Sequence, residues 1–336
     1  IRPDHGRQDQ MSTKNVSLKA IAAQMNVSIN TVSHAIRDMD DVSEALKLKI
    51  RKKAIEMGYM PNHVAQHLKR DEKPVVAILV DSFTNLYFNT FSNELTKLLY
   101  ERKEFDFMIL YAGQLKCEVI KQCVLLRVDL VVTHLEPDAE TLEFAKPNNI
   151  QMVFVGSSHF FNDVDTVAID NQMGCSLAAR YLLNFHECKK FLYAGVNYFL
   201  SEERFNIFRS ELQSLSDDCD VRYFNSDEED VRALYTCISQ GYRNVFFYND
   251  RLAYELLGKL DSIAINIRRI YPDLHLVGFD GLCECVAGLK QISTIKIDFP
   301  EFAEKTYEVI KKRLEQPLAP MQQIVLKVTL HQRRKD

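Results

Sequence analysis

The chain of 336 residues lacks the short motifs that mark the commonest catalytic sites. It contains no GxSxG nucleophile elbow, no GxxxxGK[ST] phosphate loop, no GxGxxG dinucleotide loop and no HExxH zinc helix. The acidic run Asp227-Glu228-Glu229-Asp230 is more typical of a helix start than of paired catalytic carboxylates, because acidic residues stabilise the first turn of a helix. We therefore expect a protein that is not an enzyme and that has no bound cofactor.

The cysteines form none of the usual metal or disulfide patterns. All eight are scattered, no CxxC pair occurs, and Cys283-Glu284-Cys285 has no second pair at metal-binding spacing. Unpaired thiols inside apolar segments suit a reducing compartment. We expect no metal site and a cytoplasmic location.

Long apolar runs and targeting signals are also missing. No run is long enough to cross a bilayer and no signal peptide is recognisable, which argues against a membrane partner. Residues 1–10 have no periodicity and precede Met11, so we expect a tag or a disordered segment there. No coiled-coil heptads follow the last strand pattern, which favours a dimer over a tetramer held by a C-terminal zipper.

Positive charge is concentrated near the N-terminus, although the whole chain has a net charge of −4. Residues 11–70 contain ten Lys and Arg residues against five acidic residues, which gives about +5 there and leaves about −9 for the remainder. A basic head on an acidic body concentrates the attraction for phosphate in the head. The asymmetry favours a head that binds nucleic acid.

Two short helical patterns meet at a tight corner within this basic segment. Ser17 and Ser28 are good N-caps for helices over 18–25 and 29–37, and the corner is Met25-Asn26-Val27. Ser43 starts a third helix over 44–57, and Gly58 ends it. The pattern predicts a helix-turn-helix bundle, whose second helix enters the major groove of DNA.

The second helix is predicted to have an inner and an outer face. Val32, Ala35 and Ile36 are expected inside, and the outward residues are Asn30, Thr31, Ser33, His34 and Arg37. Base edges are expected to be read by Ile29, Asn30, Ser33 and His34. Phosphate contacts are expected from Lys14, Ser17, Asn26 and Thr31. The alternative is that these polar residues only form a solvated face.

From residue 75 onward, apolar strand patterns alternate with amphipathic helices. Strands are expected over 75–80, 107–111, 130–133, 152–155, 166–169, 191–194, 221–224, 245–248, 274–279, 293–297 and 324–330. Apolar strands separated by helices indicate parallel sheets that are covered on both faces. Eleven strands are too many for one compact sheet, so we expect an α/β body of two lobes with a cleft between them.

With these motifs the chain resembles the LacI/GalR family of bacterial regulators. The head carries Val-Ser-x-x-Thr-Val-Ser at 27–33, followed by Val42-Ser43, Gly58-Tyr59-x-Pro61-Asn62 and Ala65-x-x-Leu68. Weaker landmarks in the body are Asp170-Asn171-x-x-Gly174, Arg204, Asn249-Asp250-x-x-Ala253, Gly278-Phe279-Asp280 and Ile295-x-x-Asp298-Phe299. The resemblance covers 16–330, and it implies a homodimer with paired heads and a body like the periplasmic sugar-binding proteins.

The resemblance also implies a division of the chain. A helix-turn-helix domain is expected over 11–59, a hinge helix and linker over 60–74, and an effector-binding and dimerisation body over 75–336. The first lobe is expected to contain about 75–170 and 299–322, and the second about 171–298 and 323–336.

The hinge helix is expected to be too short to be stable alone in water. Paired with its symmetry mate in the minor groove it gains contacts, and the resemblance implies that Leu68 inserts at a central CG step. The other DNA contacts expected from this region are Tyr59, Asn62, His63 and Ala65. The alternative for Leu68 is an anchor that fixes the linker to the body.

The expected effector cleft combines hydrogen-bonding side chains with aromatic faces, which suits a polyhydroxylated ligand. Open α/β sheets bind ligands at the carboxyl ends of their strands. The candidate residues are Ser82, Tyr87, Phe88, Asp170, Asn171, Arg204, Asn249, Asp280 and Phe299. Asp170 and Asp280 have an alternative interpretation as helix caps, and Phe299 as a core residue.

These patterns predict a sequence-specific transcriptional repressor that binds a pseudo-palindromic operator in double-stranded DNA. The expected effector is an inducer, a sugar or a sugar phosphate. One alternative is the same fold with a purine or protein corepressor that strengthens DNA binding, and another is a non-regulatory sugar-binding protein. The chain departs from the family pattern at Ala20, His34 and Ile207, which leaves the operator sequence and the effector identity open.

Overall fold

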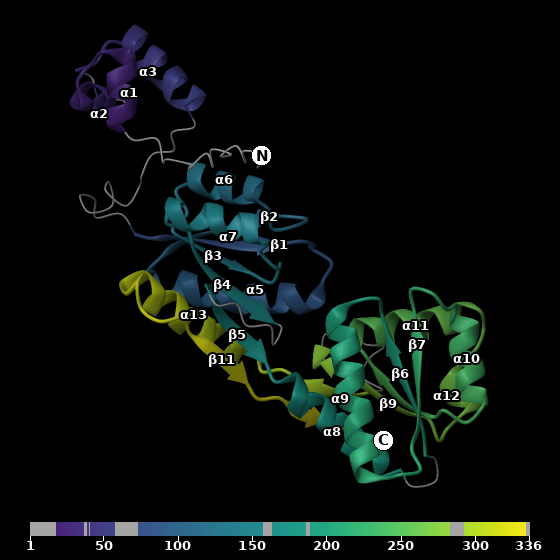
Figure 1. Cartoon of the computed structure of the whole chain (residues 1–336). Coiled ribbons are helices and arrows are strands. Elements are labelled where there is room, and N and C mark those ends of the chain that lie inside the picture. Colours follow the sequence, from purple (N-terminus) through teal and green to yellow (C-terminus); the bar gives the residue numbers. More distant parts are fainter. Residues whose placement is uncertain are drawn as a thin grey trace, which may run out of the picture. The chain divides into compact units, whose positions relative to one another are not determined.

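The computed structural model describes residues 18–36, 39, 41–57, 73–156, 163–185, 189–282 and 292–333. The chain divides into two compact units, whose boundary lies between Glu72 and Lys73. The elements of both units are labelled in Figure 1.

The described part of the N-terminal unit contains the helices α1 (Leu18–Met25), α2 (Ile29–Ile36) and α3 (Glu44–Glu56). Between α1 and α2, Asn26 has a φ of 53°, a left-handed conformation that asparagine adopts more readily than most residues. The hydroxyl oxygen of Ser28 accepts a hydrogen bond from the Thr31 N–H at 3.0 Å and caps α2. The helices enclose a small core of Ile21, Ala22, Val32, Ala35, Val42, Ile50 and Ala54.

One residue of α2 differs from the prediction. Ser33 was expected on the outer face, but it is only 8% exposed. It lies three positions before Ile36, which packs against the core, so helical spacing places it at the border of the inner face. Ile29 and Asn30 are exposed, as predicted.

A six-stranded parallel sheet, in the order β11-β5-β4-β3-β1-β2, forms the first lobe of the larger unit. Its strands are β1 (Val75–Val80), β2 (Asp106–Tyr111), β3 (Leu130–Thr133), β4 (Gln151–Gly156), β5 (Asp165–Ile169) and β11 (Gln323–Leu326). One face is covered by α5 (Leu86–Arg102) and α13 (Phe299–Glu315), and the other by α6 (Cys117–Leu125) and α7 (Ala139–Ala145), which a short 3-10 turn (Lys146–Asn148) follows (Figure 1). Because both faces are covered, inner strands such as β3 and β5 are buried throughout.

The second lobe has a six-stranded sheet in the order β12-β10-β9-β8-β6-β7. Its strands are β6 (Lys190–Gly195), β7 (Asp220–Asn225), β8 (Asn244–Phe247), β9 (His275–Asp280), β10 (Ser293–Lys296) and β12 (Thr329–His331). Helices α8 (Asn171–Leu183) and α9 (Phe199–Leu215) cover one face, and α10 (Val231–Ser239), α11 (Asp250–Ser262) and α12 (Ile267–Ile270) cover the other (Figure 1). Only β12 is antiparallel to its neighbour among the described strands. The predicted α/β body with two parallel-sheet lobes is confirmed.

The described chain passes between the two lobes three times: from β5 to α8, from β10 to α13, and from β11 to β12. The prediction of a single strand over 324–330 within the second lobe was wrong. Strand β11 pairs with β5 in the first sheet, whereas β12 pairs with β10 in the second. The crossing residue Val328 is itself buried, so the apolar alternation continues through the break and hides it.

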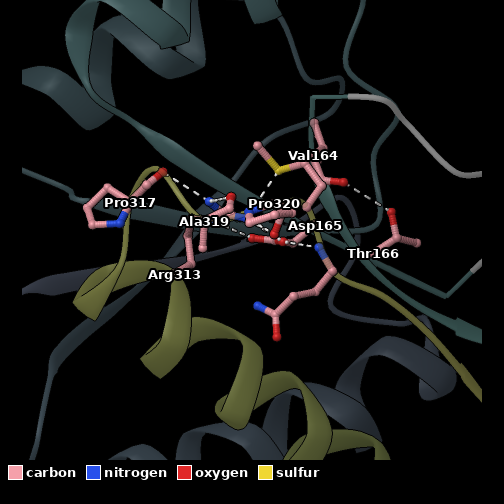
Figure 2. A network of polar contacts seen from close by, with 9 residues as sticks. Val164, Asp165, Thr166, Arg313, Pro317, Ala319 and Pro320 are labelled. Carbon is pink, nitrogen blue, oxygen red and sulfur yellow. Dashed lines mark hydrogen bonds and ion pairs between the residues drawn. The ribbon is translucent and has the colours of Figure 1, made fainter.

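A buried ion pair joins the end of α13 to β5 in the first lobe (Figure 2). Arg313 donates from Nε to Asp165 Oδ2 at 2.6 Å and from Nη2 to Oδ1 at 2.9 Å, and both side chains are at most 1% exposed. The guanidinium also donates to three backbone carbonyls, those of Pro317, Ala319 and Pro320. The Gln322 N–H donates to Asp165 Oδ1 at 2.7 Å. One guanidinium therefore orders the whole connection from α13 into β11.

A second buried carboxylate holds the start of α11 against β9 and β10. Asp250 Oδ2 accepts a hydrogen bond from the Leu282 N–H at 2.7 Å, and Oδ1 accepts one from the Thr294 hydroxyl at 2.8 Å. A Cβ at Gly278 would lie 2.0 Å from Asp250 Oδ1, so the carboxylate uses space that only glycine leaves open. Burial raises the pKa of Asp250 to about 7, against the opposing effect of these hydrogen bonds.

We expect Arg313→Met to destabilise the protein by about 3–5 kcal/mol, because the Asp165 carboxylate stays buried without its cation. Urea unfolding followed by circular dichroism measures this free energy. The control is Lys189→Met, which breaks the exposed Lys189–Asp218 pair and should change stability far less. Equal losses for the two variants would contradict the structural importance of the Arg313 ion pair.

Asp250 should make stability depend on pH. Its folded pKa of about 7 lies above the ordinary value of 3.8, so its contribution is fully present below pH 3.8 and is lost as the pH rises through 7. Asp250→Asn should flatten the decline in unfolding free energy between about pH 4 and 7. The control is Asp217→Asn at an exposed site, and a variant slope equal to that of the unmodified chain would contradict this assignment.

Candidate functional site

The carboxyl ends of strands from both sheets surround a cavity of about 720 Å³ in the larger unit. The first lobe contributes loops after β1 and β3 and the start of α5: Asp81, Asn85, Phe88, His134, Leu135 and Glu136. The lining from the second lobe includes Tyr198, Phe199, Asp227, Tyr248, Asn249 and Lys259. This is the position at which open α/β sheets bind ligands.

An aromatic stack forms the wall from the first lobe. The Phe88 ring stacks on His134 with centroids 3.3 Å apart, and Tyr87 meets Phe88 edge to face at 4.8 Å. Asp81 Oδ1 lies 3.1 Å from His134 Nε2, but the two groups are not oriented for a hydrogen bond. Burial lowers the pKa of His134 to about 4, more than the Asp81 carboxylate raises it, so the ring is uncharged at neutral pH.

Asn249 lies in the wall from the second lobe, at the start of α11. Its Oδ1 accepts a hydrogen bond from the Leu252 N–H at 2.8 Å and so caps the helix. Because the oxygen is used in this way, a ligand would meet the amide N–H groups of Asn249. The side chain can therefore cap the helix and donate to a ligand at once.

Arg204 lies directly behind the cavity wall. Its Nε donates to Asn171 Oδ1 at 3.0 Å, and its Nη1 donates to the carbonyl of Tyr248, a wall residue, at 2.7 Å. The guanidinium also lies 3.6 Å from the centre of the Phe279 ring. These contacts join α9, α8 and the carboxyl ends of β8 and β9.

Asp280 is buried near Arg204 with an unusual backbone. Its φ is 110°, in a region that residues other than glycine rarely adopt, and such strain persists only where the surroundings hold it. Burial raises the pKa of Asp280 well above the ordinary value, and the charge of Arg204 opposes this shift. On the side of the first lobe, Tyr87 packs edge to face on Phe299 at 5.5 Å.

The structure separates the nine predicted effector residues into groups. Phe88 and Asn249 line the cavity. Tyr87, Asn171, Arg204, Asp280 and Phe299 lie in a layer behind it, connected to the wall through Tyr248 and Phe88. Asp170 caps α8 by accepting from the Met173 N–H at 2.8 Å, and Ser82 pairs with Thr84. Asp170 is thus a helix cap and Phe299 also belongs to the hydrophobic core, which confirms the alternative interpretations of these two residues, whereas Asp280 is the last residue of β9. Asp230 caps α10, as the helix-start interpretation of the acidic run predicted.

Several wall residues were missed from the sequence. His134 and Glu136 follow β3, Tyr198 follows β6, and Asp227 follows β7. The rule that selected Ser82 and Asn249, a polar or aromatic residue just after a strand, also applies to these residues. Applied to every predicted strand end, the rule finds them.

The head presents the exposed start of α2 as its candidate nucleic-acid surface. Ile29 is 46% exposed and Asn30 is also exposed, whereas the Thr31 hydroxyl bonds to Ser28 Oγ at 2.8 Å. His34 Nδ1 lies 2.5 Å from Asp41 Oδ2, so one of its ring nitrogens already has a partner within the head. Seven predicted DNA contacts lie outside the described residues: Lys14, Ser17, Tyr59, Asn62, His63, Ala65 and Leu68.

No group of three or more His, Cys, Asp or Glu side chains in the described part of the chain is arranged to hold a metal ion. No described helix is both long and apolar enough to cross a membrane.

Residues 17–62 match the family model described as bacterial regulatory proteins, lacI family. Over 318 residues, the chain is 22% identical to the HTH-type transcriptional repressor PurR of Vibrio parahaemolyticus. The matched region covers 89% of this chain and 92% of that relative.

Two solved structures share the fold. A LacI family transcriptional regulator from Enterococcus faecium with bound ribose superposes with a TM-score of 0.64 at 20% identity, over 77% of this chain and 97% of that one. The lac repressor dimer bound to operator and an anti-inducer superposes with a TM-score of 0.61 at 17% identity, over 95% of this chain and 98% of that one. The head thus matches the lacI family model, and the chain is similar to regulators of that family along nearly its whole length.

Proposed function

We propose that the chain represses transcription by binding an operator in DNA, and that a small molecule in the cavity sets its affinity for that operator. The observation that carries the proposal is the cavity of about 720 Å³, which residues of both lobes line. A ligand there contacts both lobes at once, so its affinity depends on how the lobes are arranged. The relative in Vibrio parahaemolyticus is named a repressor, which supports the direction of the output.

The head reads the operator through the exposed start of α2. Ile29 and Asn30 face base edges, while Asn26 and Thr31, together with Lys14 and Ser17, contact phosphates. His34 reads DNA through Nε2, because Nδ1 is paired with Asp41. Ser33 is buried, so we assign it no base contact, although it lies beside Asn30 on this surface.

The domain assignment is a head over 11–59, a hinge helix and linker over 60–74, and a body from 75 onward. Two chains pair on a pseudo-palindromic operator, in the same way that the lac repressor binds its operator as a dimer. The hinge helix enters the minor groove between the two heads, with DNA contacts from Asn62, His63, Ala65 and Leu68, and Tyr59 at the end of the head also contacts DNA.

The proposed effector is a sugar-like molecule, and the ribose in the Enterococcus faecium structure supports this choice. The chain acts in the cytoplasm without a catalytic step. A ligand that favours one lobe arrangement by about 1–3 kcal/mol changes operator affinity some 5–150-fold.

The direct test has two steps. Operator DNA is selected from random sequence with the full chain, and candidate ligands are found by thermal shift, because binding to the folded state raises its melting temperature. Each ligand is then titrated into the operator complex while fluorescence anisotropy is followed. Release identifies an inducer, whereas tighter binding identifies a corepressor. Absence of any sequence-selective DNA binding would contradict the proposal.

Asn30→Ala should alter base preference. Loss of its amide removes about 1–3 kcal/mol of discrimination at one base pair, so selection should return operators that are degenerate at that position. Gln24→Ala is the matched control, because it removes an exposed amide from α1. An equal loss of affinity on all sequences for Asn30→Ala would refute base reading by this residue.

Tyr198→Ala should weaken effector binding without disrupting the fold. The ring lines the cavity and is 44% exposed, so its truncation should cost effector affinity about tenfold, or roughly 1.4 kcal/mol. Isothermal titration calorimetry with a ligand found by thermal shift measures this loss. Tyr254→Ala is the control, since Tyr254 is 52% exposed on α11 but does not line the cavity. Similar effects of the two variants would place the effector elsewhere.

A further inference from the structure

The charged side chains in the cavity wall are mainly acidic. Four carboxylates line it, those of Asp81, Glu136, Asp227 and Glu255, against the two cations Arg251 and Lys259. Arg251 Nε donates to Glu255 Oε1 at 2.7 Å, so these two charges largely cancel. Three carboxylates and one ammonium group then determine the charge of the described wall.

The three carboxylates come from both lobes. Asp81 and Glu136 follow β1 and β3 of the first lobe, and Asp227 follows β7 of the second. Asp227 Oδ2 accepts a hydrogen bond from the Asn197 N–H at 2.7 Å, which fixes its position without neutralising its charge. Carboxylates on opposite walls of a cleft with low-dielectric walls produce a negative potential inside it.

The cation behind the wall does not offset this potential at the surface of the cavity. Arg204 is buried, and its guanidinium is engaged by Asn171, the Tyr248 carbonyl and the Phe279 ring. His134 is in the wall, but its depressed pKa keeps it uncharged at neutral pH. A phosphate or carboxylate ligand would therefore meet more negative than positive charge.

The aromatic side chains of the wall suit the opposite kind of ligand. Phe88, Tyr198, Phe199 and Tyr248 all line the cavity. The rings of Tyr198 and Phe199 are partly exposed, and their centroids are 4.6 Å apart. Aromatic faces attract ammonium groups through the negative charge of their π systems, and nearby carboxylates add to this attraction.

We propose that the effector of this cavity is a polyhydroxylated amine, such as an amino sugar, bound with its amine protonated, and that the cavity discriminates against sugar phosphates. The ammonium group lies between the carboxylates of Asp81 and Asp227, and the ring lies against the aromatic side chains. The inference rests on the proposed function, because it names the ligand class of the same cavity.

The test uses the full chain and three matched sets of probes. Glucosamine, galactosamine and mannosamine are each compared with the parent sugar and with its 6-phosphate by isothermal titration calorimetry. In at least one set the amine should bind about tenfold more tightly than the neutral sugar, and the phosphate should bind most weakly. Added salt should lower the affinity for the amine but not the affinity for the neutral sugar.

Two variants test whether the carboxylates of the cavity wall cause the preference for the amine. Asp81→Asn and Asp227→Asn should each lower affinity for the binding amine about tenfold while leaving the parent sugar unchanged. Asp217→Asn is the matched control, because this exposed acid follows the far end of α9. Loss of affinity in all three variants, or in none, would overturn the assignment.

Other outcomes also overturn the inference. They are a phosphate or neutral sugar that binds at least as tightly as its amine, and absence of amine binding up to about 10 mM. Operator release by a sugar phosphate would overturn this inference but support the proposed function. Failure of the chain to bind any DNA sequence selectively, both without ligand and with each ligand found by thermal shift, would instead contradict the proposed function.

Discussion

The burial of the Arg204 guanidinium is the constraint on which the wall of the proposed effector site depends. A buried cation is stable only with its hydrogen bonds satisfied, so Asn171 and the Tyr248 carbonyl must stay in place around it. Asn171 is the first residue of α8, directly after the chain crosses from the first lobe, and Tyr248 lies in the cavity wall. A ligand that shifts Tyr248 therefore acts on a crossing between the lobes through a single guanidinium.

The other two crossings are anchored on the side of the first lobe. Phe299 begins α13 immediately after the second crossing, and Tyr87 connects it to the wall residue Phe88. At the other end of α13, Arg313 and Asp165 order the connection to β11, after which the chain makes its third crossing. Asn171 and Phe299 therefore place residues of the layer behind the cavity directly after two of the three crossings.

The sequence predicted most strands and helices because apolar periodicity and caps such as Ser28 are local signals. The break at Val328 was not predictable from periodicity, since a buried residue continued the pattern into a different sheet. The position of the candidate site was predicted, as were the wall residues Phe88 and Asn249, but the rest of the wall was not. Whether Phe88 or Tyr87 faces the cavity depends on tertiary packing, and Arg204 was named without any local sign that its guanidinium would be buried. His134 and Tyr198 occupy strand ends, where a wider application of the same rule finds them.

The central claim is that the cavity and the operator-binding head are coupled, and thermodynamic reciprocity tests it most directly. If a ligand changes operator affinity by a given factor, operator DNA must change the affinity for that ligand by the same factor. Ligand affinity should therefore be measured by calorimetry on the full chain, with and without saturating operator DNA. The account predicts two affinities that differ by the factor found in the operator titration. Equal affinities with and without operator would contradict coupling between the cavity and the head.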